Sequence, residues 1–351
     1  MTDNTASRLG QGANILVVSA AFVIVCAGLR TAAIILVPAL AALFISTVAL
    51  PPIMGLQRKG APLWLAATTV LGVVLCGLLI AGVIAADAVT TFSQHLPFYT
   101  AALQDRFFTT NEWFKQHGLN ITDAPIASIL NADTLVNMLG SMLGAIAGIL
   151  RDSVFVFLTT CFILAEAASM PAKIRIAFSI DDSSIKPWIR VLDDMTTYLF
   201  VKTQTSLLTA VLVAVSLWWI GVPFPLALGL LSFVLNFVPV FGAILAGVPA
   251  IFLAWVILGP GSAGITLGVY TAINVIIGNV IEPKLMGQRL GLSMIAVFLS
   301  LVFWGYLLGS VGTLLAVPLT MLAKIFFDHT TDLRWLSILL GPASAESIRE
   351  R

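Results

Sequence analysis

Eight apolar runs separated by short polar connections dominate the chain. They lie at residues 13–29, 31–50, 63–86, 146–168, 204–222, 226–258, 264–281 and 291–327. A membrane-spanning helix needs about 20 mostly apolar residues. The pattern therefore predicts an all-α, polytopic membrane protein with about 8 membrane segments. The runs 226–258 and 291–327 are too long for one simple span, and Pro and Gly interrupt both, so each is either two spans or a re-entrant hairpin.

The first run, Ala13 to Leu29, has two interpretations. It follows a polar start, as the apolar part of a cleaved signal peptide does. However, no small-residue cleavage site follows it, and the next run begins at once with Thr31. We therefore expect a first transmembrane helix that is retained.

Lysine and arginine in the connections predict the orientation, because cytoplasmic loops carry the excess of these residues. The segment 87–145 holds two such cations against five acidic residues, so it is expected outside as an extracytoplasmic helical segment. Cations expected in cytoplasmic connections are Arg58, Lys59, Lys173, Arg175, Lys186, Arg190 and Lys202. The prediction is a multi-pass protein of the bacterial inner (plasma) membrane, with both termini in the cytoplasm.

Two connecting segments have the three- and four-residue apolar spacing of an amphipathic helix. In the outer segment 87–145 these positions are Phe92, Leu96, Tyr99, Leu103 and Phe107. In the inner segment 169–203 they are Ile185, Trp188, Leu192, Met195 and Leu199. The first is expected to cap the outer face, and the second to lie on the cytoplasmic surface and run into the fifth span.

Glycines repeat at four-residue spacing at two places, which lets membrane helices approach closely. They are Gly140, Gly144 and Gly148, and then Gly305 and Gly309. This packing can lie within one chain or between copies, so a homo-oligomer is one possible expectation.

Composition agrees with the membrane interpretation and excludes several functions. Of the 351 residues, 59% are hydrophobic and 10% charged, against about 25% charged in soluble domains. A net charge of +1 argues against nucleic-acid partners. The dispersed cysteines and histidines fit no metal site, and neither a nucleotide-binding loop nor a nucleophile–base cluster occurs. We therefore expect no cofactor, no metal and no enzyme activity.

The C-terminal third carries the features expected of a transport path. We expect a single membrane domain, 1–351, with a broken-helix transport core at 204–327. Its first interrupted segment reads Asn236-Phe-Val-Pro239-Val-Phe-Gly242 and continues to Pro249. A second, Gly312-Thr-Leu-Leu-Ala-Val-Pro318, echoes Gly242 to Pro249 with one residue deleted. Secondary transporters bind substrate at such broken helices and are often built from internal repeats.

Polar residues inside apolar helices are costly and tend to be functional. Asn274, Gly278 and Glu282 recur at four-residue spacing, with Asn279 beside them and Pro283 following. Glu282 is either a solvated helix end with a local ion pair or a carboxylate that couples a proton or cation to transport. Glu166, at the end of the fourth run, has the same two interpretations, and the solvated end is preferred there.

Several blocks of this third resemble a known family. They are Asn236-Phe-Val-Pro239-Val-Phe-Gly242, then Asn274-Val-Ile-Ile-Gly-Asn279-Val-Ile-Glu282-Pro283-Lys284-Leu-Met-Gly287, then Gly291 to Gly305, and Gly309-Ser-Val-Gly312 to Pro318. They resemble the signatures of the autoinducer-2 exporter (AI-2E, PerM-like) family. The resemblance implies export of autoinducer-2 and a part in quorum sensing and biofilm behaviour. Similar members are also assigned sodium or lithium/proton antiport.

Three hypotheses follow, all with the lipid bilayer as a partner. The first is a secondary transporter that exports a small polar signal molecule, with Glu282 carrying any coupled proton. Its pathway or hinge residues would be Asn236, Pro239, Gly242, Pro249, Asn274, Asn279, Glu282, Pro283, Gly312 and Pro318. The second is a monovalent cation (Na⁺/Li⁺)/proton antiporter, with Glu282 and Glu166 as coupling carboxylates. The third is a membrane scaffold without transport. The Pro- and Asn-bearing runs argue against it, because a scaffold has no need of costly polar interruptions.

Overall fold

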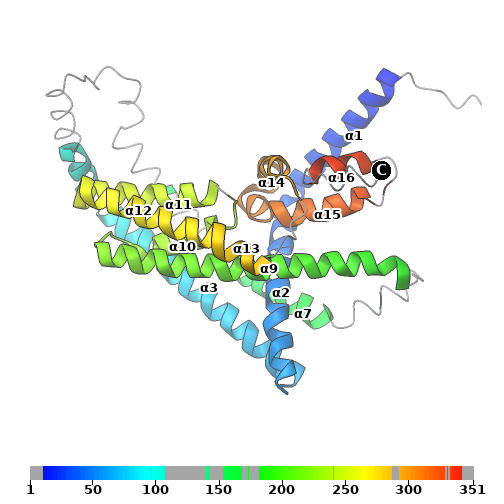
Figure 1. The fold of residues 1–351 in the computed structure, drawn as a ribbon, viewed down its shortest axis with the longest axis horizontal. Coiled ribbons are helices and arrows are strands. Elements are labelled where there is room, and N and C mark those ends of the chain that lie inside the picture. Colours follow the sequence, from blue (N-terminus) through cyan, green and yellow to red (C-terminus); the bar gives the residue numbers. More distant parts are fainter. Residues whose placement is uncertain are drawn as a thin grey trace, which may run out of the picture. The chain divides into compact units, whose positions relative to one another are not determined.

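The computed structural model describes residues 11–95, 97–106, 140–141, 153–167, 173, 182–239, 241–286, 292–328, 330 and 333–341. All regular elements in these ranges are helices (Figure 1). Among the predicted positions, Leu96, Phe107, Gly144, Gly148 and Arg175 lie outside the described residues.

Six of the described helices are long and apolar enough to cross a membrane. They are Ala33–Arg58, Leu63–Gln94, Leu192–Ile220, Phe241–Leu258, Pro260–Leu285 and Ile295–Leu314, and shorter apolar helices cover Leu16–Thr31, Val154–Glu166 and Pro225–Leu235. Large apolar side chains also point outward, for example Ile34 and Trp219 with 82% and 81% exposure. Lipid is the solvent that suits such surfaces. The prediction of an all-helical, polytopic membrane protein is confirmed.

The chain folds as two compact units. The terminal unit consists of residues 1–41 and 292–351, and the central unit consists of residues 42–291. The proposed transport core, 204–327, therefore has its first interrupted segment in the central unit and its second in the terminal unit.

Helices α1 (Gln11–Thr31) and α2 (Ala33–Arg58) form the first two apolar runs and meet without a loop. Helical hydrogen bonds continue through the junction, from Ala32 N–H to the Gly28 carbonyl and from Leu36 N–H to the Ala32 carbonyl, both 2.9 Å. Antiparallel helix pairs use about two to five connecting residues. The junction at Ala32 thus lacks the loop by which two spans fold back on each other.

The terminal unit continues with α14 (Met294–Leu314), α15 (Ala316–Asp328) and α16 (Arg334–Leu340). Helix α1 packs on α14, where Arg30 donates to the Tyr306 hydroxyl at 2.7 Å. Ser293 caps α14 by accepting from Ala296 N–H, and its own N–H donates to the Leu340 carbonyl at the end of α16. The C-terminal helix thereby holds the start of α14.

The central unit contains α3 (Leu63–Gln94), α7 (Ser153–Ala167) and the 39-residue α9 (Asp182–Ile220). The inner amphipathic stretch and the fifth apolar run are therefore parts of one helix. Of the predicted apolar positions on α9, Met195 and Leu199 are buried, whereas Leu192 is exposed.

Helix α10 (Pro225–Leu235) starts a broken segment that continues as α11 (Phe241–Leu253) and the π-helical turn η1 (Ala254–Leu258). After Gly259 the chain returns as α12 (Pro260–Ile276), a second π-helical turn η2 (Ile277–Ile281) and α13 (Glu282–Met286). Eleven residues of α-helix extend about 16 Å, roughly half the thickness of a bilayer core. Helix α10 is therefore too short to span the bilayer core. Helix α11 together with η1, Phe241–Leu258, is long enough to span it.

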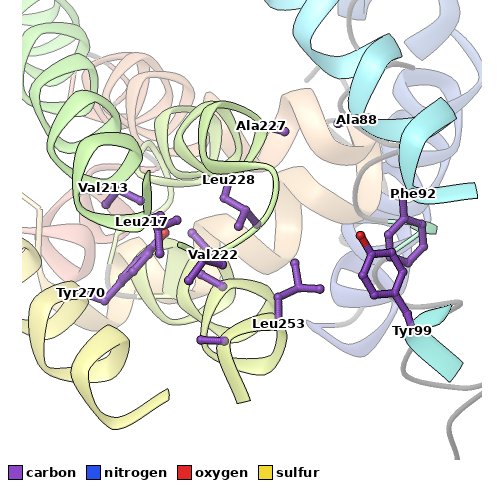
Figure 2. Close-up of a cluster of buried hydrophobic side chains, with 13 residues drawn as sticks. Ala88, Phe92, Tyr99, Val213, Leu217, Val222, Ala227, Leu228, Leu253 and Tyr270 are labelled. Atoms are coloured by element: carbon purple, nitrogen blue, oxygen red, sulfur yellow. The ribbon is translucent and has the colours of Figure 1, made fainter. Parts of the chain in front are cut away.

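The main apolar core of the central unit joins α9, α10, α11 and α12 to the end of α3 (Figure 2). Phe92 at the end of α3 stacks on Tyr99 of the helical stretch 97–106, with ring centroids 5.4 Å apart. Phe224, before α10, packs against both rings. From the same stretch, Arg106 Nε donates to the Val256 carbonyl of η1 at 3.3 Å. The stretch 97–106 therefore contacts both the entry and the exit of the α10–η1 segment.

Candidate functional site

The break between α10 and α11 is a tight turn built around a glycine. Val238 N–H donates to the Leu235 carbonyl at 2.8 Å, and Gly242 N–H donates to the Val238 carbonyl at 3.0 Å. A Cβ atom on Gly242 would lie 1.8 Å from the Leu235 carbonyl oxygen. Only glycine lets the chain pass so close to that carbonyl. The break predicted around Pro239 and Gly242 is present.

Asn236, the C-cap residue that follows α10, connects the break to α9. Its Nδ2 donates to the hydroxyl of Ser206 at 2.9 Å. Ser206 is completely buried, with 0% exposure. On the next turn of α10, Ser232 donates to its own helix at the Leu228 carbonyl and also contacts the Tyr270 hydroxyl of α12. Three helices thus bring polar side chains together beside the break.

A row of buried polar residues on α9 extends from this meeting point. It consists of Lys202, Thr205, Ser206 and Thr209, all at most 5% exposed. The row ends beside a close approach of α9 and α10, where a Cβ atom on Gly229 would lie 2.8 Å from the Ala210 carbonyl oxygen. Hydroxyl side chains within an otherwise apolar helix tolerate this burial because they bond nearby carbonyls, as Thr209 does with Thr205.

At the other end of the row, Lys202 forms an ion pair with Glu282 of α13. Its ammonium lies 2.9 Å from each of the two carboxylate oxygens. The side chains are 7% and 18% exposed. Lys202, expected in the connection before the fifth apolar run, is instead buried well within α9, which begins at Asp182. The solvated-end interpretation of Glu282 included a local ion pair. The ion pair observed is not local, because Lys202 lies 80 residues away in sequence.

The other predicted residues of this region have separate environments. Asn274 Nδ2 donates to the Tyr270 carbonyl of its own helix at 2.8 Å. Asn279 and Pro283 are exposed, whereas Pro249 is fully buried within α11. The structure therefore connects Asn236 to the middle of the α9 polar row through Ser206, connects Glu282 to its Lys202 end, and leaves Asn279 outside it.

The second interrupted segment, in the terminal unit, uses the same device as the first. Gly309 has a φ of 68° and breaks α14. A Cβ atom on Gly312 would lie 2.1 Å from the Trp304 carbonyl oxygen, and Pro318 is buried in the first turn of α15. Trp304 then bonds Thr320 of α15 through its Nε1 at 3.0 Å. Gly242 and Gly312, which the sequence echo aligns, both lie where the backbone passes over an earlier carbonyl.

Glu166, the other carboxylate singled out, pairs with Lys173. Both side chains are exposed, at 45% and 62%. This agrees with the solvated helix end preferred for Glu166. Within the described ranges, no three His, Cys, Asp or Glu residues lie together as a metal site would require.

Comparison with known proteins identifies the family. Residues 15–332 match the model of the AI-2E family transporters. The chain belongs to the AI-2E transporter family. Its relatives include a Haemophilus influenzae protein described only as a transport protein, 36% identical over 92% of this chain and 94% of its own length. Escherichia coli YhhT, described in the same terms, is 34% identical over 96% of both chains. The AI-2 transport protein TqsA of Escherichia coli is 30% identical over 96% of this chain and 98% of its own length.

This AI-2E transporter is therefore a multi-pass membrane protein of a bacterial transporter family and not an enzyme. Sequence reasoning missed Lys202, Ser206 and Tyr270 as members of the site. A signal for two of them was present, because Lys202, Ser206 and Thr209 recur at the three- and four-residue spacing of one helix face. Tyr270 lies one turn before Asn274 and carried no such signal.

Proposed function

We propose that this AI-2E transporter exports the quorum-sensing signal autoinducer-2, or a small polar molecule like it, across the bacterial inner membrane. The relative TqsA of Escherichia coli, which is named an AI-2 transport protein, supports this substrate. Biofilm control would follow from export of the signal. We expect both termini of the transporter to lie in the cytoplasm.

The observation that carries the proposal is the Asn236–Ser206 hydrogen bond at the break of the α10–α11 segment. Polar side chains in apolar helices are costly and mark transport pathways, and broken helices supply substrate sites in secondary transporters. An amide offers both donors and an acceptor, and a hydroxyl offers one of each kind. A small hydroxylated ligand can exchange hydrogen bonds with such a set.

In this proposal the residues have distinct roles. Asn236, Ser206, Ser232 and Tyr270 exchange their mutual hydrogen bonds for bonds to substrate. Pro239, Gly242 and Pro249 shape the broken segment, as Gly312 and Pro318 shape the second one. Asn274, Asn279 and Pro283 are proposed as part of the pathway or hinge and not of the substrate contact. Alternating access then follows from movement of the broken segments.

The alternative is monovalent cation/proton antiport on the same scaffold. It needs a carboxylate in the membrane that exchanges its proton for the ion, and Glu282 is the partly buried candidate. Glu282 is already engaged at both oxygens by Lys202, which an exchange site must release. The geometry therefore favours export of a polar molecule over antiport at Glu282.

The test measures uptake of labelled autoinducer-2 into everted vesicles, with and without an imposed proton gradient. Asn236→Ala and Ser206→Ala should each lower uptake strongly at equal expression. Ser216→Ala is the matched control, because Ser216 lies on the same helix and bonds the Leu212 carbonyl of α9 itself. Unchanged uptake in both Asn236→Ala and Asn274→Ala would refute the site. Sodium-dependent collapse of the gradient without uptake would support antiport instead.

A further inference from the structure

We propose that the ammonium of Lys202 takes the place that a bound cation occupies in cation-driven transporters, so that Glu282 needs no Na⁺ or Li⁺ from solution. The inference rests on the transport function proposed above, and it adds a statement about energy coupling. It concerns what neutralises the partly buried Glu282 carboxylate, and therefore which ions transport does not consume.

The geometry of the pair is that of a cation held by a carboxylate. Lys202 Nζ lies between the two oxygens of Glu282, 2.9 Å from each. Lys202 is the only charged residue among the buried residues that the structure describes. Tyr198, one turn earlier on α9, is also buried, and Lys284 on α13 is exposed. The positive charge beside Glu282 therefore comes from α9.

An ionised carboxylate in an apolar environment must be neutralised in every state that keeps it buried. A proton, a bound metal cation or a fixed basic side chain can do this. The first two exchange with solution and couple transport to a gradient. A lysine side chain is part of the protein, so it neutralises the carboxylate without consuming an ion.

While Lys202 is in place, Glu282 needs no cation from solution, but a cation could bind there if the ammonium were removed. The pair joins two elements, the long helix α9 and the short α13 that follows the π-helical turn η2. Removing the ammonium leaves a carboxylate with two oxygens facing the space that Nζ filled. That space and charge suit a small monovalent cation, which carries the same single charge.

The experiment measures thermal unfolding of the purified full-length protein in detergent, with NaCl, LiCl or choline chloride at constant ionic strength. Wild-type Tm should not change when Na⁺ replaces choline. Lys202→Met shortens the side chain by one atom and removes its charge, so it leaves the Nζ position open. This variant should gain a Tm rise of roughly 2–5 °C per tenfold increase in Na⁺, as binding to the folded state requires. The double variant Lys202→Met/Glu282→Gln should lose this dependence. Binding of ²²Na⁺ gives a second readout.

Two results would overturn the inference. Glu282-dependent Na⁺ binding by the wild type would show that the carboxylate is itself a cation site despite Lys202. A Lys202→Met protein that ignores Na⁺ and Li⁺ would show that the pair is structural. Lys202→Gln provides a second neutral variant, and recovery of either variant only in Na⁺ counts as support. No substrate is used, so failure of the autoinducer-2 assignment leaves this result interpretable.

Discussion

Gly242 lies directly over the carbonyl of Leu235, seven residues earlier in the chain, so that any side chain at position 242 would overlap that oxygen. The overlap involves backbone on one side and Cβ on the other, and no rotamer change relieves it. The turn between α10 and α11 therefore depends on glycine more strictly than on the neighbouring proline.

Gly242→Ala should destabilise the protein by about 1–3 kcal/mol or more and abolish uptake, because the α10–α11 turn must open. Gly264→Ala in α12 is the matched control, since a Cβ there meets nothing within 4 Å. Thermal unfolding in detergent and the vesicle assay measure the two effects. Equal stability of the two variants would mean that the turn tolerates displacement.

Breaking the Lys202–Glu282 pair should be strongly non-additive. Lys202→Met or Glu282→Gln alone leaves an unmatched polar or charged group and should cost about 3–5 kcal/mol. The double variant removes both charges and should cost less than either single one. A double-mutant cycle of unfolding free energies tests this. Additive losses would indicate that the two charges do not interact in the folded protein.

Asn236 and Asn279 of the C-terminal third should differ in importance. Asn236→Ala removes a bond to another helix and leaves buried Ser206 without that partner, so it should cost about 1–3 kcal/mol and lower uptake about tenfold or more. Asn279→Ala changes an exposed side chain and should change stability by less than about 0.5 kcal/mol. Unfolding and uptake at matched expression should both show the larger loss for Asn236→Ala. A larger loss of stability or uptake for Asn279→Ala would contradict this prediction.

Arg106 should fix the exit of the α10–η1 segment. Its guanidinium donates to the Val256 carbonyl, which lies in the last turn before Gly259, and cations are favourable at helix C-termini. Arg106→Ala should loosen η1 by about 0.3–2 kcal/mol, seen as faster amide exchange at residues 256–259. Arg106→Lys keeps the charge and should show a smaller change. Exchange that is faster throughout the protein would instead indicate general destabilisation.

The helical architecture was predictable from the sequence because it depends on local pattern. Each of the eight apolar runs is mainly helical where the structure describes it, and the exceptions include the break at 236–239 and the turn at Leu315. The broken segment was also predictable, since Pro239 and Gly242 act on their own backbone. The echo at Gly312 and Pro318 marked the second break for the same reason.

The partners within the site were not predictable, because they depend on how distant helices meet. Lys202 is close to Arg190 and Lys186 in sequence and looked like one more cytoplasmic cation. Its burial follows from α9 being continuous, which places it opposite α13. Asn274 and Glu282 were expected to share a face, but one bonds its own helix and the other bonds α9.

The π-helical turn η2 changes the helical register between Asn274 and Glu282, so the two side chains do not share one face. It lies between them and contains one residue more per turn than an α-helix would. Each residue rotates an α-helix by about 100°, so deleting one residue from 277–281 would swing the Glu282 carboxylate away from Lys202 by about that angle. The length of this turn is therefore as much a determinant of the ion pair as the identity of either charged residue. A homologue that kept both charges but lost one residue here would keep the two charged side chains and lose the ion pair between them.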